Sequence, residues 1–138
     1  MAVAASMVLD ASVTIAALVV ETNTPKARAL LSDPPDAIHV PSIWLLEVNN
    51  FLVRAIQRGT IDLSFQSRSN AYLAALPLTV HAGVDFASLP PVSELAIKHR
   101  LTVYDASYLA LALRLGIPIA TFDEALAHAA AAENLPVL

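Results

Sequence analysis

Four acidic side chains have the types and positions needed to act together: Asp10, Glu47, Asp105 and Asp123. Each of the three aspartates ends a short apolar run and stands directly before a helical pattern. In a sheet of parallel strands such positions meet at the carboxyl edge, where ligands bind. Carboxylates that converge without cations repel one another, and at least one takes up a proton through a raised pKa. A divalent cation removes that conflict, so the pattern predicts a site for a hard metal such as Mg²⁺.

Helix capping is the simpler interpretation of each aspartate taken singly, because Asp is a preferred N-cap residue and the helix dipole favours a carboxylate there. Glu47 has no such explanation, since it lies inside the helical pattern 43–58. It lies about 100° around the helix from the middle of the apolar stripe, and so borders the core. Asn50, Arg54 and Arg58 share its flank. This polar row predicts one wall of a cleft.

Other catalytic chemistries find little support in the residues. The chain has no cysteine, which excludes a disulfide framework, a thiolate nucleophile and a Cys-ligated zinc site. Its four histidines form no i, i+4 ligand pair, and we expect them to be surface or satisfied interior side chains. With three glycines, the chain also has no phosphate loop, dinucleotide turn or Gly-x-Ser-x-Gly elbow. A nucleotide cofactor is therefore not expected.

Short apolar runs that alternate with helical patterns must position the acids. The strand candidates are 6–9, 37–40, 78–80, 117–121 and 136–138, and the helix candidates are 12–20, 24–32, 43–58, 63–75, 91–99, 106–115 and 124–132. Such alternation predicts βαβ crossovers and a mainly parallel sheet that helices cover. Gly59 and Gly116 are placed to end helices.

Length and composition favour one buried domain. The 138 residues, 1–138, fit a single domain, and the proline-rich stretches 33–36 and 89–91 are short enough to be connections. The apolar content of 57% favours a sheet buried on both faces, a subunit interface, or both. The formal net charge is −4, but if four acids hold a metal, the other eight equal the basic residues in number.

A membrane segment is not expected. Only 14% of the residues are charged, yet no stretch reaches about 18 apolar residues without a charge. The best candidate, 1–20, carries Asp10 and lacks the basic start of a secretory signal. We therefore expect a cytoplasmic protein.

Each of the four acids stands in a short motif. The motifs are VLDAS at 8–12, PSIWLLEV at 41–48, YDASYLALA at 104–112 and ATFDEAL at 120–126. The acids within them are 37, 58 and 18 residues apart, from Asp10 to Glu47, to Asp105 and to Asp123. In this order and over almost the whole chain, the sequence resembles the PIN-domain ribonucleases, and among them the VapC type of bacterial toxin.

The resemblance implies a fold, an activity and partners. The fold is a three-layer α/β/α sandwich around a mainly parallel sheet of about five strands. The activity is endonucleolytic cleavage of RNA, with the four acids binding Mg²⁺ or Mn²⁺. Ser12 and Thr121 match positions where the family often has a hydroxyl near the site, and would orient carboxylates or water, although Ser12 could equally just start a helix. Family members are commonly homodimers, neutralised by a small antitoxin encoded beside them.

Two arginines are candidates for guiding RNA towards the acids. Arg54 and Arg58 lie about 10 Å and 16 Å along the predicted helix from Glu47, on nearly the same side. Phosphate contacts from Lys or Arg supply most of the sequence-independent affinity for nucleic acid. The alternative is that both are ordinary solvated residues or form weak surface ion pairs.

Two other functions stay open on the sequence. A receiver-type phosphoacceptor also places acids at strand ends, but it needs an acidic pair near the first strand and a lysine after a late strand. The only lysines here are Lys26 and Lys98, and Asp10 has no acidic neighbour. A non-enzymatic PIN-like module would keep the fold for protein binding. Against it, a buried acidic cluster costs stability and serves little purpose without metal.

Overall fold

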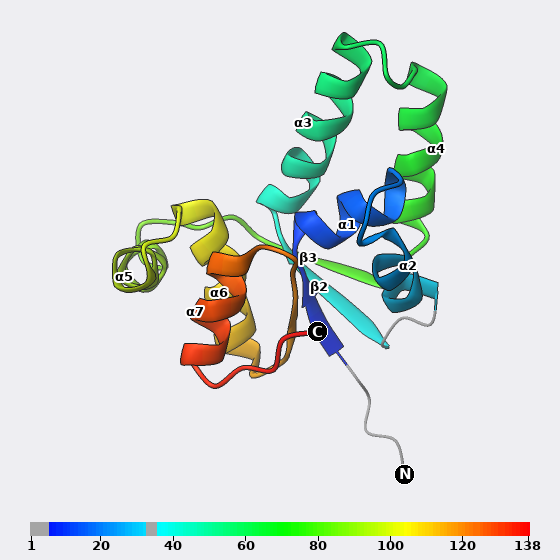
Figure 1. Ribbon diagram of the computed structural model, residues 1–138. Helices are drawn as coiled ribbons and strands as arrows, with labels where there is room; N and C mark the ends of the chain where they lie inside the picture. The colour runs from blue at the N-terminus through cyan, green and yellow to red at the C-terminus, as the bar shows by residue number, and fades with distance from the viewer. Residues whose placement is uncertain (1–5, 33–35) are drawn as a thin grey trace.

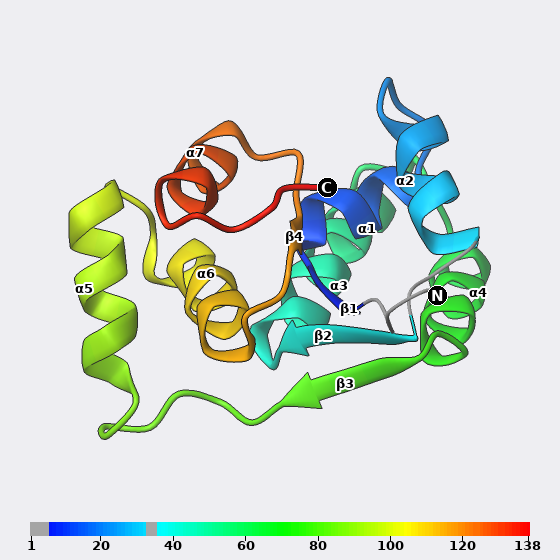
Figure 2. The same ribbon diagram turned by 90° about the horizontal axis from the view of Figure 1, so that it is seen from below.

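A parallel sheet forms the centre of the computed structural model, which describes residues 6–32 and 36–138 (Figure 1). Its strands are β1 (Ser6–Leu9), β2 (Ala37–Pro41), β3 (Leu78–His81) and β4 (Ile119–Ala120). They lie in the order β3-β2-β1-β4, and all pairings between these strands are parallel. Figure 2 shows β2 and β3 side by side, running in the same direction. The expected parallel sheet is confirmed.

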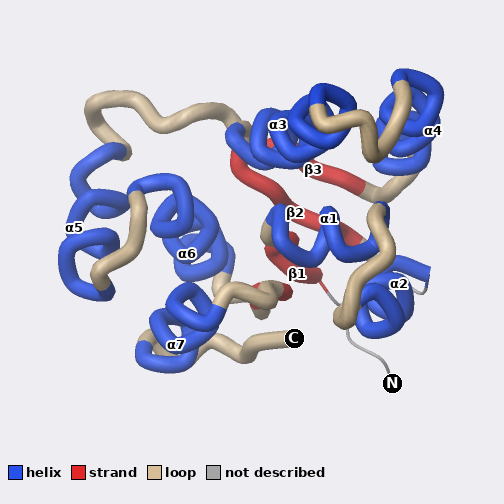
Figure 3. Tube along the Cα trace, turned by 45° about the horizontal axis from the view of Figure 1, so that its top comes forward, coloured by secondary structure: helices blue, strands red, loops and turns tan. Residues whose placement is uncertain are grey.

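Helices cover this sheet. Within the described residues they are α1 (Ala11–Leu18), α2 (Thr24–Ser32), α3 (Ile43–Gln57), α4 (Leu63–Ala74), α5 (Leu89–His99), α6 (Val103–Leu115) and α7 (Glu124–Ala132). Figure 3 shows α1–α4 on one side of the sheet and α5–α7 on the other, as expected for a layered α/β fold. None of them, in the described ranges, is both long and apolar enough to cross a membrane.

The proline-rich stretches 33–36 and 89–91 were both predicted to be connections. The stretch 89–91 is helix rather than a connection, because α5 begins at Leu89 and prolines are tolerated in a first turn, where the missing N–H has no partner in any case. The other stretch, 33–36, falls on residues 33–35, which lie outside the described residues. Gly116 ends α6 and Gly59 follows α3, both with positive φ, as their predicted places at helix ends require.

The prediction of about five strands is wrong for the described chain, which contains four. The fifth candidate, 136–138, makes only an isolated parallel bridge between Val137 and Ile119. Proline at 136 has no N–H to donate, and β4 offers only two residues for pairing. The strand expected at 117–121 is short because the chain turns towards α7 directly after Ala120.

The core lies on both faces of the sheet. Met7, Val8 and Leu9 of β1 are all buried, as are Ile38 of β2 and Ile119 of β4. A continuous apolar run is typical of a parallel strand that helices cover on both faces. Side chains from the helices complete this core, among them Trp44, Leu52, Leu109 and Leu126. The high apolar content therefore serves the sheet, and it holds the carboxyl ends of β1 and β4 in fixed positions.

Candidate active site

Asp10 lies at the junction of β1 and α1 and is almost completely buried, with 4% of its surface exposed. It is the N-cap of α1, where its Oδ2 accepts a hydrogen bond from the Ser12 backbone N–H. The same Oδ2 also accepts from the hydroxyl groups of Ser12 and Thr121, the latter at 2.9 Å. The two hydroxyls that the sequence singled out therefore both contact this carboxylate. No hydrogen bond between described residues reaches its other oxygen, Oδ1.

Ser12 and Thr121 also tie the first strand to the segment after β4. Ser12 Oγ accepts from the Phe122 backbone N–H at 3.0 Å, and Thr121 Oγ1 accepts from the Asp123 backbone N–H at 3.0 Å. Each hydroxyl thus donates to Asp10 and accepts from the chain beside Asp123. These hydrogen bonds place the segment that carries Asp123 next to Asp10. Starting a helix is consequently not the only structural role of Ser12.

Asp123 is half-buried and is the N-cap of α7. Its Oδ1 accepts from the Leu126 backbone N–H at 2.8 Å. No hydrogen bond between described residues reaches its Oδ2. Capping and a role in the site are therefore compatible, because each uses a different oxygen of the carboxylate.

Asp105 lies in the first turn of α6, and not at the end of a strand as predicted. Thr102 is the N-cap, and its hydroxyl accepts from the Asp105 backbone N–H at 3.0 Å. The run 101–104 contains Thr, Val and Tyr, which favour strands, but the Thr102 cap makes Val103 the first helical residue. The capping interpretation of Asp105 is also wrong. Its side chain is half-buried at the positive end of α6.

Glu47 comes from the second turn of α3 and is half-buried, as expected from its place beside the apolar stripe. Its Oε1 accepts a hydrogen bond of 2.7 Å from the hydroxyl of Tyr108. Tyr108 is fully buried and lies three residues after Asp105 on α6. Tyr108 was not among the residues predicted to lie at the site. Two features of the sequence could have indicated Tyr108: it lies one helical turn from Asp105, and the hydroxyl of a buried tyrosine needs a hydrogen-bond partner.

The four acids interact electrostatically. Burial raises the pKa of Asp10, and the charge of Asp123 raises it further, while the Ser12 and Thr121 hydrogen bonds lower it. Burial also raises the pKa of Asp105, with added contributions from Asp10 and Asp123. The pKa of Glu47 is raised first by burial and then by Asp10 and Asp105, against the lowering effect of Tyr108. The carboxylates thus lie close enough to disfavour one another's charge.

They do not form a ready-made metal cage. Within the described ranges, no three or more His, Asp or Glu side chains are grouped closely enough to hold an ion between them. Mg²⁺, however, is usually bound through one or two carboxylates, with waters and substrate phosphate completing its octahedron. The donor set is all oxygen, and three of its members have pKa values raised by burial and by like charge. This chemistry fits a hydrated hard cation.

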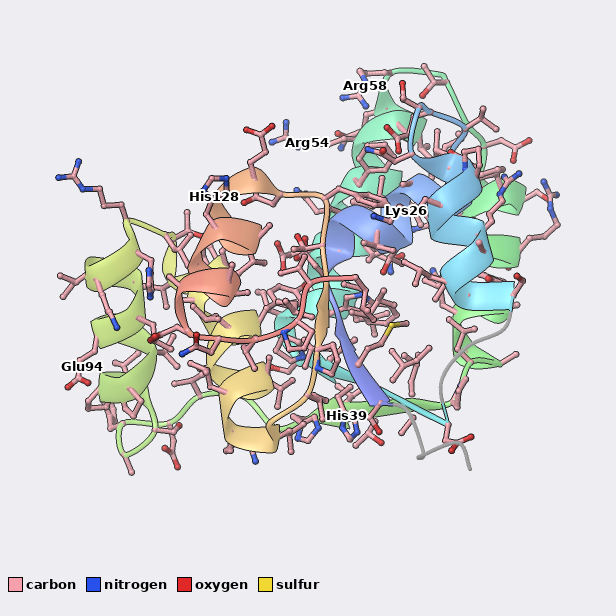
Figure 4. The ribbon with its side chains drawn as sticks, turned by 60° about the horizontal axis from the view of Figure 1, so that its bottom comes forward. Lys26, His39, Arg54, Arg58, Glu94 and His128 are labelled. Atoms are coloured by element: carbon pink, nitrogen blue, oxygen red, sulfur yellow. The ribbon has the colours of Figure 1, made fainter. Side chains whose placement is uncertain are left out.

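The predicted RNA-guiding arginines lie at the C-terminal end of α3, Arg54 in its last turn and Arg58 as its C-cap. Arg54 and Arg58 are both exposed, and neither forms an ion pair with another described residue. Figure 4 shows them at the end of α3 that projects from the body of the molecule. A third cation is Lys26 of α2, whose Nζ lies 5.7 Å from the centroid of the Phe122 ring. Phe122 directly precedes Asp123 in the chain. Lys26 was not among the residues predicted to lie near the site.

These features define an α/β protein with acidic side chains at the carboxyl edge of a parallel sheet. The chain belongs to the PIN domain family, whose sequence profile matches residues 7–132. It is 32% identical over 124 residues to Ribonuclease VapC3 of Pyrobaculum aerophilum, which covers 88% of this chain and 92% of that protein. The family predicted from the four acidic motifs is confirmed.

Two solved structures share the fold. The protein PAE2754 of Pyrobaculum aerophilum superposes with a TM-score of 0.70 at 22% identity, covering 94% of this chain and 87% of its own. VapC20 of Mycobacterium tuberculosis, described as a sarcin-ricin loop cleaving toxin, superposes with a TM-score of 0.73 at 18% identity, covering 89% and 94%. At these identities the likeness concerns the fold.

Proposed function

We propose that this chain is a metal-dependent endoribonuclease, the toxin of a toxin–antitoxin pair. The observation that carries the proposal is a set of three carboxylates from separate elements, Asp10, Glu47 and Asp105, whose pKa values are raised by burial and by the charges of neighbouring acids, in a PIN domain related to a ribonuclease. Family membership favours this function over a receiver-type phosphoacceptor. The substrate class is RNA, and the reaction is hydrolysis of a phosphodiester bond.

In this proposal Asp10 and Asp105 are direct ligands of Mg²⁺ or Mn²⁺, and Glu47 and Asp123 complete the site directly or through water. A bound divalent cation would supply activation of a water for in-line attack on phosphorus and neutralisation of phosphate charge. The chain's own contribution is to hold the donors. Ser12 and Thr121 fix one oxygen of Asp10, which leaves Oδ1 available to the site.

Tyr108 acts on Glu47 as a positioning residue. Its hydroxyl holds Oε1 at 2.7 Å and stabilises the charged form of a carboxylate whose pKa burial raises. The aromatic ring is buried in the core, so the hydroxyl is fixed relative to Asp105 on the same helix. Glu47 is thereby held facing the other acids.

Arg54 and Arg58 are proposed to contact phosphates of the RNA beyond the cleavage point. Both are exposed and free of ion pairs with described residues, which leaves their charges available. The proposed protein partners are a small antitoxin and a second copy of the chain. Large apolar side chains at the surface support such interfaces, among them Phe86 at 94% and Ile97 at 80% exposure. The proposed location is the cytoplasm.

The test is cleavage of end-labelled RNA by the purified chain. We expect cuts with Mg²⁺ or Mn²⁺, none in EDTA, and none with Asp10→Asn. Asp62→Asn is the matched control, because Asp62 is also an N-cap aspartate, with its Oδ1 2.8 Å from the Phe65 N–H, but lies outside the acidic site. Full activity of Asp10→Asn would refute the metal site. No cleavage by the parent chain on any cellular RNA, with metal bound, would favour a binding module.

A further inference from the structure

A cavity of about 540 Å³ lies beside the acids, between α3 and the start of α6. Glu47 lines it, so the cavity and the acidic site share a wall. The other wall carries Tyr104, the residue directly before Asp105, with 60% of its surface exposed. The volume of the cavity falls in the range of small-molecule sites, about 300–1,000 Å³. A group bound here would lie next to whatever the acids hold.

The lining is apolar with one available amide. Leu46 and Val53 of α3 are 68% and 40% exposed and contribute apolar surface. Asn49 and Asn50 both line the cavity but differ in their partners. The Asn49 amide is occupied, since it exchanges two hydrogen bonds with Asn70, at 3.1 and 2.8 Å. The Asn50 side chain is exposed and makes no hydrogen bond with a described residue.

We propose that this cavity binds the nucleobase of the nucleotide next to the cleaved phosphate, with the base stacked on Tyr104 and its edge hydrogen-bonded by Asn50. This inference rests on the proposed ribonuclease function. Single-stranded RNA is recognised by stacking of splayed bases on aromatic rings and by hydrogen bonds to their edges. The exposed ring of Tyr104 and the free amide of Asn50 supply these two contacts, and the apolar side chains form the floor of the cavity.

Charge favours an uncharged base over a phosphate or an acidic peptide as the occupant of the cavity. The carboxylate of Glu47 stands at one end of the cavity and would repel a peptide's acidic groups. Arg54 follows Asn50 by one turn of α3, on the exposed side, and can meet the phosphate of the same strand. The base is uncharged and lies between these two charges. The cavity therefore extends from Glu47 of the acidic site towards Arg54.

Binding can be tested without cleavage. The probe is a three-nucleotide RNA with 2-aminopurine at its centre, added to the full chain carrying Asp10→Asn, which lacks a proposed metal ligand and so leaves the RNA intact. Stacking on Tyr104 should quench the fluorescence. Adding Tyr104→Leu should abolish the quenching and weaken binding about 5- to 150-fold, the equivalent of the 1–3 kcal/mol of one base–aromatic stack. Tyr104→Phe should retain both.

Tyr72→Leu in the same background is the matched control, because Tyr72 is 43% exposed on α4 and does not line this cavity. It should bind and quench like the Asp10→Asn parent. Asn50→Ala should compress the differences in affinity among trimers with A, G, C or U at the centre. Unchanged binding by Tyr104→Leu would overturn the proposal, as would equal losses in Tyr104→Leu and Tyr72→Leu. Failure of the unmodified chain to cut RNA would instead count against the ribonuclease function alone.

Discussion

Divalent cation should stabilise the folded chain, and Asp10→Asn should remove that response. In the folded chain the pKa values of Asp10, Glu47 and Asp105 lie above their ordinary values of 3.8 and 4.5. Without metal, the folded state therefore holds protons more tightly than the unfolded state. Its stability falls as pH rises from about 4 through the raised folded pKa values, and stays lower above them.

The size of the metal effect follows from mass action. At a free Mn²⁺ concentration of 100 times Kd, binding to the folded state adds about 2.7 kcal/mol to the free energy of unfolding. For a domain of this length, each kcal/mol raises Tm by about 4 °C. We therefore expect a shift of about 10 °C at pH 7.5. The shift should shrink towards pH 4, because protons compete with the cation for the same carboxylates.

Calorimetric melting in EDTA and in increasing Mn²⁺ measures this effect. In EDTA at pH 7.5, Asp10→Asn should melt at the same temperature as the parent or higher, since it removes a buried charge that raises the pKa of its neighbours. With Mn²⁺ it should show no comparable rise, whereas Asp62→Asn should respond like the parent. The reasoning would be refuted if 10 mM Mn²⁺ left the Tm of the parent chain unchanged, or if Asp10→Asn showed an undiminished Tm shift.

Three further outcomes are expected. Tyr108→Phe removes the hydrogen bond to Glu47, so cleavage at limiting Mg²⁺ should fall about 10- to 150-fold, the equivalent of 1.5–3 kcal/mol, and half-maximal rate should need more Mg²⁺. Replacing Arg54 and Arg58 with Ala should lower the slope of log K against log salt by up to about 1.4 in RNA-binding titrations, while the Mn²⁺ shift stays. Light scattering at micromolar concentration should give twice the chain mass, and a monomer mass would contradict the homodimer.

The strands could be predicted where burial on both faces leaves a continuous apolar run. Met7 to Leu9 of β1 form such a run, whereas β2 alternates buried Ile38 and Val40 with half-buried Ala37 and His39; both strands were predicted to within one residue. The prediction failed where apolar residues lack partners for pairing. Val137 is apolar, but beside it Pro136 lacks an N–H, and the two-residue β4 leaves room for a single bridge. Strand composition alone does not reveal how many neighbours a strand will find.

The places of the three aspartates before helices could be predicted because each stands in a short local motif. The structure places all three at helix N-terminal ends, Asp10 directly after β1 and Asp123 three residues after β4, and that placement is largely local information. The contacts around the acids are not local. Tyr108 and Glu47 are 61 positions apart in the chain, and Lys26 and Phe122 are 96 positions apart. Periodicity assigns Tyr108 to the core, which is correct, but it says nothing of the partner of its hydroxyl.

The three aspartates and Glu47 are stabilised in their positions by different interactions. Asp10, Asp105 and Asp123 each lie at the start of a helix, where free backbone N–H groups and the positive end of the dipole favour a carboxylate. Helix capping by Asp10 and Asp123 is therefore compatible with a role of the same carboxylates in the proposed site. Glu47 lies in the second turn of α3 and has no such support, and it accepts the Tyr108 hydroxyl instead. Loss of that one donor should therefore disturb Glu47 more than loss of any single hydroxyl disturbs Asp10, which retains a second hydroxyl and a backbone N–H.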